Sequence, residues 1–172
     1  SMVIALNMFD ELNRRHIHLD YKTLGAMIGV PIIPTISKSG EGISTLLDTV
    51  ISVYEGSNSE VRHVHVNLGS EIERAVTVLK DRIKADGEIG HKFSPRYIAI
   101  KLLEGDSDTE DSVRESAHGG QLIKLRDQLV AGLKDKFSDD VPAEIAAEKY
   151  GYIAGALAET LTREDESEDD TT

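Results

Sequence analysis

Two short apolar runs, at residues 3–6 and 31–36, constrain the fold of this chain more than any other feature. Neither run alternates with polar residues, so each suits a strand that is buried on both faces, as the strands of parallel sheets are. Helical spacing of apolar residues predicts one helix between the runs, at about 21–28, and another after them, at 43–54. Together these segments predict a βαβ unit, in which the two strands are parallel neighbours joined by a right-handed crossover.

The rest of the chain predicts an all-helical region. A polar connector at 55–60 separates it from the βαβ unit, and a partly alternating stretch at 61–68 is compatible with one short strand. Apolar stripes and end signals, such as Ser94 followed by Pro95, predict four helices. These helices cover residues 70–85, 94–105, 121–137 and 142–162.

Negative charge gathers in two segments of the chain. Of the formal net charge of −12, residues 164–172 contribute −6 and residues 104–115 contribute −5. Runs of acids are typical of solvated segments, so 164–172 is predicted to be a disordered tail and 106–115 an acidic loop between two helices. We therefore predict an α/β domain at 1–56, a helical domain at 57–163 and the tail.

The composition also excludes several classes of protein. No basic stripe is present that could displace counterions from phosphates, so nucleic acid is not expected as a partner. The absence of cysteine excludes disulfides, thiolate zinc sites and cysteine nucleophiles. No apolar stretch approaches the roughly 20 residues that span a bilayer, and no secretory signal is recognised, so a cytoplasmic location is expected.

Asn7, Met8 and Asp10 come directly after the first predicted strand. Their spacing resembles NKxD, the fourth guanine-nucleotide motif of Ras-like GTPases. In that family the Asp carboxylate accepts two hydrogen bonds from guanine, a charge-assisted pair that adenine cannot form, and the Asn ties the loop to the rest of the pocket. Asn and Asp at a strand end are also typical of a turn and a helix N-cap, so this motif alone leaves both interpretations open.

A second motif, PTISKSGEG at 34–42, follows the second predicted strand. It resembles the fifth motif of the same GTPases, (T)SAK, in which the backbone N–H at the Ala position, here Ser37, faces guanine O6 and the Lys, here Lys38, flanks the ring. Two such motifs in the right order fit the rule that ligands bind outside the carboxyl ends of parallel strands. The favoured interpretation is a guanine pocket formed by Asn7, Met8, Asp10, Ser37 and Lys38.

Further segments narrow the family. They read HLDYKTLGAMIGVPIIPTISKSGEGI at 18–43, RYIAIKLLEGD at 96–106 and EKYGYI at 148–153. With the two motifs, they resemble the ferrous-iron transport protein B (FeoB) family, whose cytoplasmic end carries a G domain followed by a helical domain, and the resemblance covers most of the chain. Met8 stands where NKxD has Lys, and an unbranched thioether can lie over a purine as a Lys stem does.

The resemblance implies an α/β fragment of a Ras-like G domain, with two parallel strands and helices, followed by an all-α helical domain. It also implies a parent GTPase at the cytoplasmic face of the inner membrane, which uses GTP or GDP with Mg²⁺ and carries a membrane domain on the same polypeptide. In that parent the helical domain would regulate GTP-dependent uptake of ferrous iron.

No Gly-Lys-[Ser/Thr] sequence occurs in the 172 residues, so the P-loop that would cradle the phosphates is expected in a missing N-terminal half. The chain is therefore expected to be a fragment with no catalytic residues and no bound nucleotide of its own. The open edge of its first strand predicts a homo-oligomer formed through residues 1–56.

The alternative is a free-standing acidic helical interaction protein with an accidental NxxD. Two histidine pairs, His16 with His18 and His63 with His65, make a metal site conceivable, but spacing fixes no third ligand, so no metal site is predicted. The acidic stretch at 106–117 fails the EF-hand pattern, because its sixth position is not Gly and its twelfth is not Glu.

Overall fold

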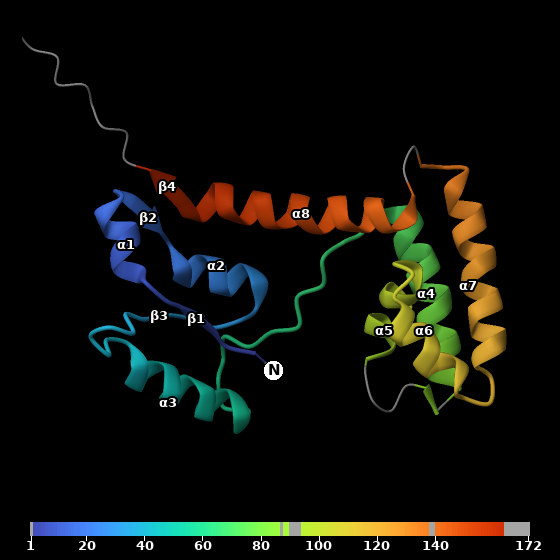
Figure 1. Ribbon diagram of the computed structural model, residues 1–172, viewed down its shortest axis with the longest axis horizontal. Coiled ribbons are helices and arrows are strands. Elements are labelled where there is room, and N and C mark those ends of the chain that lie inside the picture. Colours follow the sequence, from blue (N-terminus) through green and yellow to red (C-terminus); the bar gives the residue numbers. More distant parts are fainter. Residues whose placement is uncertain (1, 87, 90–93, 138–139, 164–172) are drawn as a thin grey trace, which may run out of the picture. The chain divides into compact units, whose positions relative to one another are not determined.

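The computed structural model describes residues 2–86, 88–89, 94–137 and 140–163 (Figure 1). The chain divides into two compact units: a first unit, Ser1–His65 with Ile153–Thr172, and a helical unit, Val66–Tyr152. The first unit contains β1 (Ile4–Leu6), α1 (Phe9–Arg14), β2 (Ile17–Leu19), α2 (Tyr21–Ile28), β3 (Ile32–Pro34), α3 (Ile43–Tyr54) and β4 (Leu161–Arg163). The helical unit contains α4 (Ser70–Ala85), α5 (Pro95–Leu103), α6 (Ser107–Arg114) and α7 (Gly119–Lys134), and α8 (Val141–Thr160) takes part in both units.

The predicted parallel pair is confirmed in the first unit. β1 and β3 lie side by side with Ile4 opposite Ile32 and Leu6 opposite Pro34. A second, antiparallel pair was not predicted: β2 pairs with β4, so that Ile17 lies opposite Arg163. Each of these strands is three residues long, which is too short to show a periodic pattern in the sequence.

Helix α2 follows from local signals at both ends. Asp20 accepts hydrogen bonds from the Thr23 N–H (3.0 Å) and the Thr23 hydroxyl (2.6 Å), and these bonds lower the pKa of the Asp20 carboxyl. At the other end Gly29 adopts a φ of +70°, and a Cβ there would clash with the carbonyl oxygen of Arg62. Glycine is therefore favoured here for two reasons: it adopts the positive φ at the helix end without strain, and it leaves room for the backbone of Arg62.

The segment after α3, residues 55–65, packs against α2 through Arg62. The first unit therefore extends beyond the predicted boundary at residue 56. The Arg62 N–H donates to the Gly29 carbonyl (3.1 Å), and the Arg62 guanidinium donates to the carbonyl of Ala26. These bonds place residues 57–65 with the first unit. The expected strand at 61–68 is wrong: no described residue of that stretch forms a strand.

Helix α3 has one broad apolar face, only part of which is buried. Val53 is buried, and Asp48 is the one charged side chain of the helix. Side chains on the outward face remain exposed in this chain: Ile43, Leu47, Val50, Ile51 and Tyr54. Exposed apolar side chains gathered on one face of a helix are typical of an interface, so the outward face of α3 has the composition of one.

The helical unit has a continuous core. Its buried members come from every helix of the unit, with Val113 from α6. The most deeply buried of them are Leu68, Ile72, Val76, Leu79, Ile83, Leu102, Leu103, Leu122, Val141 and Ile145. A bidentate pair between Arg96 and Glu73, with both N–O distances at 2.7 Å, fixes the chain where it enters this unit. Glu73 also accepts from the Leu68 N–H, and Arg96 donates to the Val66 carbonyl. The backbone groups of Leu68 and Val66 are thus bonded to side chains, whereas in the expected strand at 61–68 they would have bonded to a neighbouring strand.

The expected acidic loop at 106–115 is wrong, because this segment contains α6. Asp106 caps the helix by accepting from the Thr109 N–H (2.9 Å) and hydroxyl (2.7 Å). Glu110 pairs with Arg114 (2.5 Å) and with the buried Arg126 of α7 (2.8 Å). Arginines therefore neutralise part of the negative charge that had suggested a solvated loop.

The remaining helices agree with the predictions within a few residues. α7 ends at Lys134 rather than 137, and α8 ends at Thr160, where the chain turns into β4. The predicted tail at 164–172 lies outside the described residues. In the described part of the chain, no helix has the length and apolarity needed to cross a membrane.

Candidate functional site

Asn7 joins the two candidate motifs. It follows β1, and its side-chain Oδ1 accepts from the Ser37 hydroxyl (2.8 Å), the Ser37 N–H (3.2 Å) and the Thr35 hydroxyl (3.4 Å). Thr35 is 2% exposed and comes directly after β3. The loops at the carboxyl ends of the two parallel strands are thus held together by one amide oxygen.

Backbone bonds fix the same two loops to the sheet. The Thr35 N–H donates to the Leu6 carbonyl (2.9 Å), and the Phe9 N–H donates to the Thr35 carbonyl (3.3 Å). The second loop is closed by the Ile36 N–H, which donates to the Glu41 carbonyl (3.0 Å). The site is therefore built on strand ends, where backbone positions are well defined.

Met8 and Lys38 present exposed side chains beside this network. Met8 lies just before α1 in the left-handed region, with a φ of 58°, and its side chain is 58% exposed. A non-glycine residue in that region is strained, and such strain often occurs at functional sites. Lys38 lies in the turn between Ile36 and Glu41.

Asp10 is in the first turn of α1, and its carboxylate is already paired. The Arg14 guanidinium lies 2.5 Å from the Asp10 carboxylate and 2.9 Å from that of Glu11. These neighbours raise the pKa of Arg14, chiefly through the hydrogen bond to Asp10. Arg14 therefore has a second carboxylate available if Asp10 turns toward a ligand.

Ser37 has a different contact from the one that the family resemblance assigns to it. Its N–H donates to Asn7 here, whereas the (T)SAK motif would direct this group to guanine O6. A bound base would have to share this donor with Asn7 or displace the bond. The sequence motif indicated the residue but could not show this competing bond.

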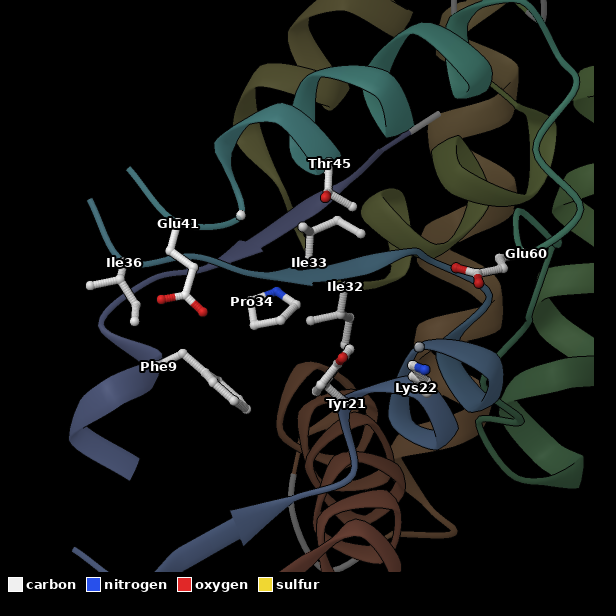
Figure 2. Close-up of a pocket in the computed structure, with 12 residues that line it drawn as sticks. Phe9, Tyr21, Lys22, Ile32, Ile33, Pro34, Ile36, Glu41, Thr45 and Glu60 are labelled. Carbon is white, nitrogen blue, oxygen red and sulfur yellow. The ribbon is translucent and has the colours of Figure 1, made fainter. Parts of the chain in front are cut away.

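A cavity of about 560 Å³ lies beside these loops, along β3 (Figure 2). Figure 2 shows Ile33 and Thr45 on one side of the strand and Phe9 and Tyr21 on the other. The two rings meet edge to face, with centroids 5.6 Å apart. Sequence analysis missed this cavity. Among the described residues, Asn7, Asp10 and Ser37 do not line it, so it is distinct from the candidate guanine site.

Within the described ranges, no group of three or more His, Asp or Glu side chains is placed to hold a metal ion.

The chain matches two family models. The model for the FeoB cytosolic helical domain matches residues 69–162, which is more than half of the chain, and the model for ferrous iron transport protein B matches residues 1–50. The chain belongs to the FeoB family. This membership argues against an accidental NxxD in an unrelated helical protein.

Similar proteins agree with this assignment. A Fe(2+) transport protein A/Fe(2+) transporter FeoB fusion protein of Porphyromonas gingivalis is 40% identical over 92% of this chain and 19% of its own length. The Fe(2+) transporter FeoB of Escherichia coli is 27% identical over 94% of the chain and 20% of its own length. The chain thus spans about a fifth of these relatives.

Solved structures confirm the fold class. A mutant of S. thermophilus NFeoB bound to GDP has a TM-score of 0.77 at 21% identity, with 93% of this chain and 58% of that chain covered. The cytosolic domain of the T. maritima FeoB iron transporter in GMPPNP form has a TM-score of 0.67 at 19% identity, with 93% and 57% covered. The chain therefore has the fold of a Ras-like G-domain fragment followed by a helical domain.

Proposed function

We propose that this chain supplies the guanine-recognition end of the G domain, and the helical regulatory domain, of a FeoB ferrous iron transporter. The whole protein would be a GTPase at the cytoplasmic face of the membrane, joined to a membrane domain on the same polypeptide. GTP or GDP with Mg²⁺ would be its cofactors, and residues outside this sequence would hold the phosphates and the metal. The helical unit would adjust nucleotide affinity and thereby iron uptake.

The observation that supports this proposal best is the network around Asn7. One amide oxygen joins the loop after β1 to Thr35 and Ser37 after β3, as a base pocket at the carboxyl ends of parallel strands requires. The solved FeoB structures bound to GDP and to GMPPNP fit a guanine nucleotide in the parent.

Asp10 would give the pocket its specificity for guanine. Its carboxylate would accept from guanine N1–H and from the exocyclic amine, after exchanging its bond to Arg14, while Arg14 keeps Glu11 as a partner. Hydrogen bonds to a charged group contribute about 1.5–3 kcal/mol each. Without a phosphate cradle, such bonds leave the affinity of this chain alone for GDP negligible.

The test joins this chain to the segment that precedes the matched region in the Porphyromonas gingivalis relative. GDP and ADP binding are then measured by calorimetry. Asp10→Asn should weaken GDP binding by about 10- to 100-fold, since it removes a charged acceptor, and should leave ADP binding unchanged. Glu11→Gln is the matched control and should change neither. A GDP preference that survives Asp10→Asn would contradict the role of Asp10. Binding of millimolar GDP to the chain without the added segment would contradict the proposal that the phosphates are held by residues outside this sequence.

Association through the first unit is part of the same proposal. The hydrogen bonds between β1 and β3 use backbone groups of Ile4 and Leu6, so the N–H and C=O of Ala5 point away from β3 and are left unpaired by that strand. The outward face of α3 is exposed and apolar. In the parent the rest of the G domain would cover these surfaces, and in the isolated chain a second copy would do so.

Light scattering tests this association. Leu47→Glu on α3 should shift the chain toward monomer, whereas the control Val78→Glu, on an exposed apolar residue of α4, should not. A monomer at millimolar concentration before any substitution would contradict the proposed self-association.

A further inference from the structure

Helix α8 is anchored at both ends. Near its start, Val141 and Ile145 are fully buried in the core of the helical unit. Near its end, Ala156 and Thr160 are each 2% exposed, and the Thr160 carbonyl accepts a 2.8 Å hydrogen bond from the Asp20 N–H in the first unit. Each end is therefore fixed by packing within its own unit.

The middle of α8 lacks such support. No residue between Ile145 and Ala156 is buried, and all of them are described. Lys149, which forms an ion pair with Glu104, makes a contact with the helical unit within this stretch. Because no side chain is buried here, the backbone bonds of the helix and the helix propensity of its residues contribute a larger share of its stability than they do at its ends.

Two glycines lie in this stretch without buried residues, Gly151 and Gly155. A Cβ on either residue would meet no atom within 4 Å, so packing does not require glycine at these positions. Relative to Ala, an interior glycine disfavours the helix by about fivefold per position. Glycines that packing does not require, and that weaken a helix, are typical of positions where helices bend.

The division of the chain falls between the same two glycines, at Tyr152 and Ile153. We propose that α8 is hinged between residues 150 and 155. Bending there changes the orientation of the helical unit relative to the first unit while the buried contacts at both ends of α8 are kept. The inference does not depend on guanine recognition, because it rests on α8 alone.

The absence of cysteine allows two spin labels to be attached without background, at Lys22→Cys on α2 and Lys124→Cys on α7. The distance distribution between these labels, measured by pulsed electron paramagnetic resonance, should be broad in the labelled chain that keeps both glycines. It should narrow by about half in the double variant Gly151→Ala/Gly155→Ala. Gly132→Ala, an exposed helical glycine of α7 with equally open surroundings, is the matched control and should leave the width unchanged.

Amide hydrogen exchange gives a second readout on the same variants. Exchange at residues 150–157 should slow by about 25-fold in the double variant, at roughly fivefold per glycine, and should not change with Gly132→Ala. Equal distance widths with and without the double substitution, or equal narrowing with Gly132→Ala, would overturn the hinge. An unchanged circular dichroism spectrum confirms that each variant is folded.

Discussion

The two units differ in how completely each buries its own apolar residues. Among the described residues of the helical unit, sixteen buried apolar residues form one cluster, to which all of its helices contribute. Among the described residues of the first unit, the buried apolar side chains are fewer, chiefly Leu19, Pro31, Ile32, Val53 and Ala156, and the outward face of α3 is exposed. The difference indicates that the helical unit is a complete folding unit, whereas the first unit is a layered structure with one layer uncovered.

Separating the units should have the largest effect. Residues 66–152 expressed alone should unfold in one cooperative thermal transition, since their core lies entirely within this range. Residues 1–65 alone should show no transition, because they lack β4 and any cover for α3. Circular dichroism melts of both pieces check this, and a cooperative transition from 1–65 would contradict the contrast between the units.

A matched pair of leucines compares the units at single-residue scale. Leu79 is fully buried in α4, so Leu79→Ala should lower the free energy of unfolding by about 2–5 kcal/mol. Leu47 is 57% exposed on α3, so at protein concentrations low enough to keep the chain monomeric Leu47→Ala should change the free energy of unfolding by less than about 0.5 kcal/mol. Urea denaturation measures both. A larger loss at concentrations where the chain self-associates would support the proposal that a second copy covers the α3 face, and a large loss in the monomer would contradict the contrast between the two leucines.

The cap of α6 should have a smaller effect. Asp106→Ala removes the acceptor for two bonds from Thr109 and should cost about 0.5–2 kcal/mol. Asp108 lies in the first turn without capping the helix, so Asp108→Ala should cost only about 0.3–1 kcal/mol through the helix dipole. Equal losses in urea denaturation would show that α6 is stabilised by its charge rather than by its cap.

The smallest expected effect is on acid stability. Hydrogen bonds from Arg126 and then Arg114 hold the pKa of Glu110 below its ordinary value of 4.5. Because the pKa is lower in the folded state, this stabilisation is fully present above pH 4.5 and is lost as pH falls through the folded pKa. Glu110→Gln should therefore flatten the stability profile of the helical unit below pH 4.5, by less than about 1 kcal/mol. An unchanged profile would indicate that the pair adds nothing to stability.

Local patterns predicted the elements that are fixed locally. The apolar stripe of α4, the Ser94 cap of α5 and the apolar run of β3 all lie within a few residues of their predicted positions. The β2–β4 pair escaped prediction because its partners are distant in sequence and each strand is three residues long. α6 was missed although Asp106 and Thr109 carry an N-cap signal, because the surrounding charge was interpreted as loop.

The candidate site shows the same limit. Motif spacing predicted that the loops of Asn7 and Ser37 belong to one pocket, and the structure joins these two residues directly. The bond that occupies the Ser37 N–H, and the pairing of Asp10 with Arg14, depend on the conformation of the loops without a ligand. A motif records which residues meet a ligand, and it does not record what those residues contact in its absence.

The pairing of β2 with β4 has a consequence for synthesis of the protein. Ile17 meets Arg163, so the first unit is completed by residues that leave the ribosome after the whole helical unit. The helical unit can therefore fold while the nascent first unit still has an open strand edge at β2. Once folded, the helical unit shortens the flexible segment between β2 and β4 and lowers the entropic cost of joining them. The order of translation thus makes the helical unit an intramolecular aid to the assembly of its neighbour.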